Sequence, residues 1–183
     1  MGIISDINKE RELIGSFLLS REAINEAIEY KFDYEECVDD FNKEVIKIIL
    51  DKCHIDFSFI PTINFIIDSL EIEKKLDNKK SIEKEKKNIM LKLNRYKKMI
   101  EREVINDSQY KDIASRNIEL LRDLNIKRNI IYVLKNGLDY INLPSNEFIT
   151  ELKNGLNKVE LNSGLIQEIS VYSGFKNLKE EME

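Results

Sequence analysis

The chain has 183 residues, 34% of them charged, and a formal net charge of −5 at pH 7. No apolar run approaches the ~20 residues that a membrane-spanning helix needs, and the N-terminus lacks the basic and apolar regions of a secretory signal. Two cysteines in such a chain indicate reduced thiols. We therefore exclude a membrane protein and a disulfide-stabilised secreted domain, and we expect a cytoplasmic protein of a prokaryote or of a phage-infected cell.

Turn-forming residues are scarce, with six glycines and two prolines, whereas Glu, Lys, Leu and Ile are abundant. This composition favours helices over a β-sandwich or barrel. We predict an all-α fold in three parts. Residues 1–75 form a compact helical domain, residues 76–143 a long, charged, antiparallel helical hairpin, and residues 144–183 a linker-like helix and tail.

The first 70 residues show four segments with helical spacing of apolar residues. Residues 7–31 are predicted to form two helices, capped by Asp6 (or Ser5) and by Ser20. A third helix is expected over 35–52 and a fourth over 57–70, with Pro61 in its first turn. Gly15 lies inside the first helix, where it costs about 1 kcal/mol relative to alanine. A close helix crossing at that position would explain it.

The following segment is basic, because residues 71–105 contain 12 Lys/Arg and 7 Asp/Glu. A helix capped by Ser81 is expected there, with a narrow apolar stripe that includes Tyr96. A tight group of cations on this helix could contact DNA phosphates, and Tyr96 could stack on bases. The alternative is a solvated charged face, with Tyr96 in the core. The candidate nucleic-acid contacts are Lys92, Arg95, Lys97 and Lys98.

The clearest periodicity runs from Tyr110 to Ile141 at strict 3-4 spacing, broken only by the polar residues Asn117 and Lys127. A seam this narrow packs against one partner helix. That helix is either the basic one, joined through the turn at 106–108, or the same seam of a second chain, so a homodimer or higher oligomer is expected. A polar residue in the seam could fix the register of the pair. The candidate interaction residues are Leu120, Leu124, Ile131, Leu134, Leu138 and Ile141.

Motifs for catalysis are missing from these 183 residues. The sequence contains no GxxxxGK[ST] loop, no GxGxxG and no GxSxG elbow. Cys53, His54 and Asp56 lie close together, but zinc usually takes four ligands at defined spacing. We therefore expect no enzymatic activity, no cofactor and no metal site.

The N-terminal segment ERELIGSFLLSREAINEAI resembles the start of the N-terminal domain of replicative hexameric DNA helicases of the DnaB type. In that family an acidic residue precedes a leucine-rich helix, and a short break leads to an acid and a second helix. The aromatic connector of the family is matched by Phe32 and Tyr34, and its third helix by NKEVIKIILD. The matching residues of the first two helices are Glu10, Leu13, Ile14, Gly15, Phe17, Leu18, Leu19, Glu22, Ala23 and Ile24.

Three later stretches fit the same family. Ile55, Asp56, Thr62 and Ile66 resemble the family's start of the fourth helix, and FITELKNGLNKV falls where the family has its linker helix. The segment around LLRDL resembles the second arm of the family's helical hairpin. Its matching residues are Tyr110, Ile113, Leu120, Leu121, Arg122 and Leu124. The resemblance covers residues 7–160, but a lysine-rich helix replaces the family's Gly-Gly stretch, and no ATPase domain is present.

The resemblance implies an assembly module of DNA replication. In the family this domain forms a collar in which hairpins of neighbouring subunits pair and which receives primase and helicase loaders. The chain would be a fragment of such a helicase or a stand-alone relative, with itself, primase, helicase or loader as partners. Two alternatives stay open: a phage or mobile-element protein that inhibits or regulates a nucleic-acid enzyme, and a DNA-binding accessory protein that uses the basic helix 84–102.

Overall fold

The computed structural model describes residues 6–163, apart from residues 57, 73–77, 103, 105 and 107. The described residues form helices and no β-strand, which confirms the all-α fold. They divide into two compact units, the head up to Asp123 and the arm from Leu124 onward. None of the described helices has the length and apolarity to cross a membrane.

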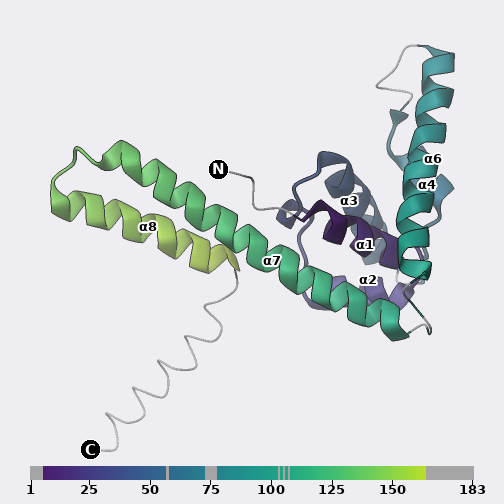
Figure 1. The fold of residues 1–183 in the computed structure, drawn as a ribbon, viewed down its shortest axis with the longest axis horizontal. Coiled ribbons are helices and arrows are strands. Elements are labelled where there is room, and N and C mark those ends of the chain that lie inside the picture. The colour runs from purple at the N-terminus through teal and green to yellow at the C-terminus, as the bar shows by residue number, and fades with distance from the viewer. Residues whose placement is uncertain are drawn as a thin grey trace, which may run out of the picture. The chain divides into compact units, whose positions relative to one another are not determined.

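The head contains the helices from α1 to α6 and the first half of α7, in chain order (Figure 1). One long helix, α7, begins in the head and ends in the arm, where it is followed by a short 3-10 turn, η2, and a last helix. The bounds are α1 Ile7–Phe17, α2 Arg21–Glu29, the 3-10 turn η1 Tyr34–Glu36, α3 Asp40–Ile55, α4 Ile63–Ser69, α6 Lys79–Glu101, α7 Ser108–Gly137, η2 Leu138–Tyr140 and α8 Ser145–Ser163.

Side-chain caps set where the first helices begin. Asp6 accepts a hydrogen bond from the backbone N–H of Lys9, and Ser20 accepts one from Ala23, as the sequence predicts. The third helix starts later than predicted. Asp33 and Glu36 form a capping box that closes η1 as a separate turn, and Asp39 then caps α3.

The next two helices also begin at caps that differ from the prediction. Thr62 accepts a hydrogen bond from the N–H of Phe65 at 3.2 Å, so α4 starts at Ile63 and Pro61 precedes the cap. Asn78, not Ser81, caps the basic helix α6, because its side-chain oxygen lies 2.9 Å from the N–H of Lys80. A short side-chain acceptor satisfies N–H groups that have no partner in the first turn.

The core of the head is built around α1. The side chains of Leu13, Ile14 and Phe17 are fully buried, and α6 packs on α1 and on α4. At Gly15 the two backbones come close, because a Cβ there would lie 2.5 Å from the carbonyl oxygen of Tyr96. The close helix crossing predicted at Gly15 is therefore confirmed. Four residues of α6 are buried in the head: Ile89, Leu93, Tyr96 and Ile100.

The helical hairpin lies one helix later than the sequence analysis expects. The apolar stripe of α6 is used in packing on α1, and the first half of α7 adds Ala114, Ile118 and Leu121 to the same core. In the arm, α8 returns alongside the end of α7 (Figure 1). The helix α8, which the sequence analysis treats as a separate linker, is thus the second helix of the hairpin. The predicted tail lies outside the described residues from position 164 onward.

Candidate protein interaction surface

Glu10, which belongs to the N-terminal segment singled out in the sequence, has a structural role in the head. The carboxylate of Glu10 is fully buried and accepts hydrogen bonds from the N–H groups of Val38 and Asp39, at 2.6 and 3.3 Å, and from the amide of Asn42 at 2.9 Å. These donors lie at the start of α3, where a negative charge is favoured by the helix dipole. Glu10 therefore joins α1 to α3.

Arg122 ties the first half of α7 to the end of α2. One of its terminal nitrogens lies 2.8 Å from the carbonyl oxygen of Tyr30 and 3.3 Å from that of Lys31. The same nitrogen is 3.3 Å from a carboxylate oxygen of Glu36. Burial raises the pKa of Glu36, while the Arg122 charge opposes that rise. Arg122 thus donates hydrogen bonds to one carboxylate and to two backbone carbonyl oxygens at the end of α2 at the same time.

A second set of polar contacts holds the start of α7. The ammonium group of Lys111 and the hydroxyl group of Ser115 each bond a carboxylate oxygen of Glu26, at 2.8 and 2.7 Å. These contacts lower the pKa of Glu26, with the hydrogen bond from Lys111 as the largest cause. Asn117 is buried and donates to a carboxylate oxygen of Glu12 at 3.3 Å. The polar seam residue Asn117 therefore has its partner within the chain.

The six candidate seam residues fall into two environments. Leu120 lies in the head and is half-buried, as are Leu124 and Ile131 in the arm. The last three are exposed, with exposed fractions of 51% for Leu134, 64% for Leu138 and 66% for Ile141. The predicted seam is thus continuous in sequence but is uncovered in its second half.

The end of α7 and the turn η2 carry apolar side chains on two sides of the axis. Successive residues are rotated by about 100°, so Val133 and Gly137 share one face, and Ile131, Leu134 and Leu138 of η2 lie about 80–140° around the axis from the middle of that face. α8 covers the first face. A Cβ at Gly137 would lie 2.6 Å from Cδ2 of Leu152, and one at Gly155 would lie 2.7 Å from Cγ1 of Val133. The seam residues therefore lie outside the face that α8 covers, and Leu134 and Leu138 are exposed.

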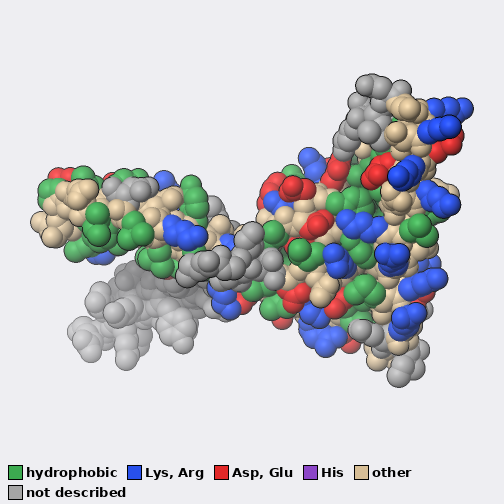
Figure 2. Space-filling view, turned by 45° about the horizontal axis from the view of Figure 1, so that its top comes forward, with side chains coloured by type: hydrophobic (Ala, Val, Ile, Leu, Met, Phe, Trp, Pro, Cys, Tyr) green, Lys and Arg blue, Asp and Glu red, His purple; other side chains and the backbone are tan. Residues whose placement is uncertain are grey.

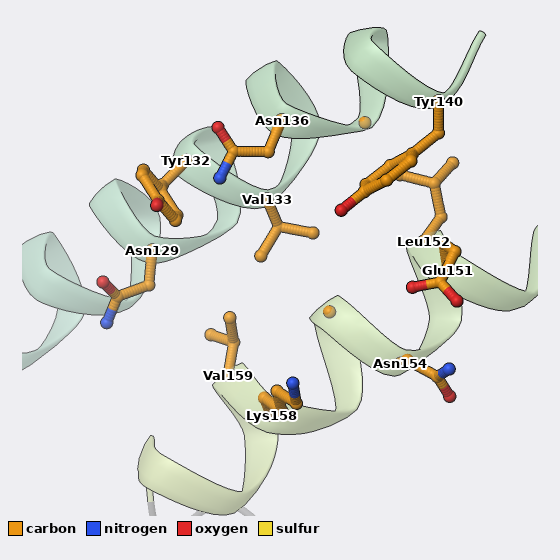
Figure 3. Close-up of a pocket in the computed structure, with 12 residues that line it drawn as sticks. Asn129, Tyr132, Val133, Asn136, Tyr140, Glu151, Leu152, Asn154, Lys158 and Val159 are labelled. Carbon is orange, nitrogen blue, oxygen red and sulfur yellow. The ribbon is translucent and has the colours of Figure 1, made fainter. Parts of the chain in front are cut away.

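A groove of about 370 Å³ lies between α7 and α8 (Figure 3). Val133 and Val159 point toward one another across it, and Tyr132 and Tyr140 lie along the α7 side. Its polar rim is formed by Asn129, Asn136, Glu151, Asn154 and Lys158. The sequence analysis misses this groove, although Gly137 and Gly155 mark positions where a second helix could approach.

The arm exposes further apolar side chains beyond the seam, and Figure 2 shows hydrophobic side chains along its surface. Besides the three seam residues, those at least 36% exposed are Tyr132, Tyr140, Leu143, Ile149 and Leu156. Monomeric proteins rarely expose large contiguous apolar patches, and such patches mark interaction sites. The exposed apolar side chains of the described part of the arm therefore make it a candidate interaction surface.

The four candidate nucleic-acid residues on α6 do not form one cluster. Lys92 is half-buried, with its ammonium nitrogen 3.6 Å from the ring centroid of Phe41, and burial lowers its pKa. Lys97 lies 3.7 Å from a carboxylate oxygen of Glu101. Arg95 and Lys98 are exposed. The side chain of Tyr96 is buried between α6 and the rest of the head, so its ring is not open to solvent.

The thiol groups of Cys37 and Cys53 are both buried and are not joined in a disulfide. Burial raises the pKa of Cys53, which makes its reactive thiolate form rarer at neutral pH. His54 is exposed at the end of α3. Among the described residues, no three His, Cys, Asp or Glu side chains are arranged to hold a metal ion.

A comparison with solved structures identifies the fold. The chain is similar to the N-terminal domain of DnaB helicase from Mycobacterium tuberculosis, with a TM-score of 0.61 and 14% sequence identity. The match covers 86% of this chain and 99% of the other. This chain has the fold of a DnaB N-terminal domain. The resemblance found in the sequence is thereby confirmed at the level of the fold.

Neither a protein-family model nor a curated protein sequence matches the chain. With 14% identity, few side chains are shared, and the likeness to the DnaB domain lies in the arrangement of helices. The matched structure is an N-terminal domain, and these 183 residues contain no phosphate-binding loop.

Proposed function

We propose that this chain is a non-catalytic assembly module of DNA replication, which pairs with a second copy of itself through the exposed seam of α7. The observation that carries the proposal is that α8 covers the face of α7 at Val133 and Gly137 and leaves the seam residues uncovered. Leu134 and Leu138, in the seam, are more than half exposed. Burial of a leucine side chain is worth about 1.5–3 kcal/mol, so these residues favour association.

The DnaB-like fold supports the replication context. We extend the proposal to primase, a helicase and a helicase loader as further partners, because the resemblance in the sequence implies a collar that receives such proteins. The exposed tyrosines and aliphatic side chains of the arm suit such contacts, since aromatic residues are enriched at protein interfaces.

The seam is tested by the oligomeric state. Sedimentation equilibrium of the whole chain should show a concentration-dependent dimer or higher oligomer, and the double variant Leu134→Gln/Leu138→Gln should be monomeric. The matched control is Ile55→Gln/Ile60→Gln, which alters two head residues with exposed fractions of 81% and 56% and should leave the oligomer intact. A wild-type chain that stays monomeric at several hundred micromolar would overturn self-pairing.

The replication context needs a separate experiment. A tagged chain should recover primase, helicase or loader from a host lysate, identified by mass spectrometry. Purified candidates should then bind the wild-type chain directly, which separates a specific contact from adventitious capture. Recovery and direct binding of an unrelated nuclease or polymerase, with no replication protein, would contradict the proposal and favour an inhibitor of a nucleic-acid enzyme.

A further inference from the structure

One sector of the solvent-facing side of α6 carries charges of one sign only, along most of the helix. Viewed down the helix at about 100° per residue, six cations fall within a sector of about 80°. This sector is centred opposite the buried residues of the same helix. Its members, which we call the basic stripe, are Lys80, Lys84, Lys87, Arg95, Lys98 and the C-cap residue Arg102, and all six are exposed.

No acidic residue lies within the sector of the basic stripe. The nearest carboxylates on the helix, Glu83 and Glu101, fall outside its edge, and Glu101 lies 3.7 Å from Lys97, which is not part of the stripe. Leu91, with an exposed fraction of 50%, fills the middle of the stripe. Figure 2 shows Lys and Arg side chains following one another along α6. Such segregation is unexpected in a chain with 34 acidic and 29 basic residues.

The stripe is also straight and long. Its ends are 22 residues apart, which corresponds to about 33 Å at a rise of 1.5 Å per residue. Cations recur at nearly every turn of the helix, so a linear polyanion could contact them in succession. Double-stranded DNA carries one negative charge per ~1.7 Å of its axis, and contacts to these phosphates supply sequence-independent affinity.

The chemistry of the stripe favours nucleic acid over an acidic protein. Four of its six cations are lysines, and lysine is depleted in protein–protein interfaces, where aromatic residues and arginine are enriched. Tyr96, the aromatic residue nearest its centre, is buried on the opposite side of the helix. The stripe offers flexible charged side chains but no exposed aromatic ring on which a base could stack. It is therefore suited to contacts with phosphate groups and not to sequence-specific contacts with bases.

We propose that the basic stripe of α6 binds the phosphate backbone of nucleic acid without sequence preference. Arg95 and Lys98 belong to this site, whereas Lys92 and Lys97 do not. The site lies on the head and is separate from the seam of the arm. It therefore adds a ligand to the proposed assembly function and does not depend on self-pairing.

The test is fluorescence anisotropy of the whole chain with a labelled 20-nucleotide single strand and with a 20-base-pair duplex. Binding to at least one of them at 50 mM salt is expected, and the affinity should fall steeply up to 200 mM. The variant Lys87→Gln/Arg95→Gln/Lys98→Gln should bind at least tenfold more weakly. Its slope of log K against log salt should be smaller by about 2 for the single strand or about 3 for the duplex.

The matched control is Arg116→Gln/Lys135→Gln/Lys153→Gln, which removes three exposed cations outside the stripe and should bind as the wild type does. Glutamine has nearly the helix propensity of lysine and arginine, so circular dichroism should show both variants folded. Absence of binding to either DNA at 50 mM salt would overturn the proposal, even if the stripe were found to bind an acidic protein. An equal loss in both variants would also overturn it. The single-strand and duplex arms identify which form is bound.

Repeating the titration with the monomeric Leu134→Gln/Leu138→Gln variant separates the two proposals. If DNA binding persists there, the stripe acts without self-pairing, as proposed. If binding requires pairing, the independence of the site is refuted, because the stripe of a single chain would then be insufficient.

Discussion

The two halves of α7 belong to one helix but have different surroundings. Residues 108–123 are held to the head by Lys111, Asn117 and Arg122, which bond carboxylates or carbonyl oxygens of other elements. Residues 124–137 contact α8 through a valine and a glycine and leave a leucine face exposed. The polar contacts thus distinguish a helix segment built into a core from one that leaves apolar side chains exposed, although both segments share one apolar spacing.

The largest effect should come from equal truncations in the two halves of α7. Leu121 is fully buried and Leu134 is half exposed, so Leu121→Ala should lower the free energy of unfolding by about 3 kcal/mol. Leu134→Ala should change it by less than about 0.5 kcal/mol. Urea denaturation of the whole chain, followed by total helix content at low protein concentration to limit self-pairing, measures both. Equal losses would mean that the second half of α7 is also core.

Next in size should be the loss of the anchor at the end of α2. Arg122→Ala removes a cation that bonds two backbone carbonyls and Glu36, and should cost about 2 kcal/mol. Arg116→Ala is the control, because Arg116 is exposed and its Nε bonds a carbonyl oxygen of its own helix. Chemical denaturation of the two variants compares them. A cost for Arg116→Ala as large as that for Arg122→Ala would contradict the role of Arg122 as an anchor.

A smaller difference is expected between the two glycines of the arm. A methyl group at Gly155 would meet Val133, whose branched side chain is stiff, whereas one at Gly137 would meet the tip of Leu152, which can move. Gly155→Ala should therefore destabilise the α7–α8 pair by about 1 kcal/mol. Gly137→Ala should be near neutral because alanine favours the helix. Amide exchange of α8 reports on the pair, and a reversed order would place α8 differently on α7.

The smallest effect is a pH dependence at the start of α7. The pKa of Glu26 is lowered, mainly by Lys111, so its stabilising contribution is complete above the unfolded-state pKa of about 4.3. That contribution is lost as the pH falls through the lower folded-state pKa. The melting temperatures of the wild type and of Glu26→Gln should hence differ at pH 7 and converge toward pH 3. Lys111→Ala should remove most of this convergence; its persistence would exclude Lys111 as the main cause.

Local chemistry allows much of the head to be predicted from the sequence. Asp6 and Ser20 act as caps at the expected positions, because an N-cap depends on atoms within three residues. Gly15 marks a helix crossing for an equally local reason, since the cost of glycine in a helix needs a compensating contact. The all-α class follows from composition alone.

Features that depend on residues distant in the sequence were not predictable in the same way. Lys92 is taken from solvent by Phe41, which lies on α3, whereas the delayed start of α3 is a local feature that the sequence analysis missed, because Asp33 and Glu36 close a separate turn. The partner of the seam could not be identified from periodicity, because a 3-4 stripe looks the same whether it meets its own chain or another. The pairing of α8 with α7 depends on the same kind of long-range packing.

The hydrogen bonds of Glu10 also bear on how the molecule opens. Val38 and Asp39 lie in an irregular connector outside the helices, yet their N–H groups are held by a buried carboxylate of α1. We expect those two amides to exchange with solvent together with the separation of α1 from the start of α3, because their hydrogen bonds must break for exchange. Local unfolding units follow such contacts, so a stretch that looks like a loop along the chain should open together with the α1–α3 contact.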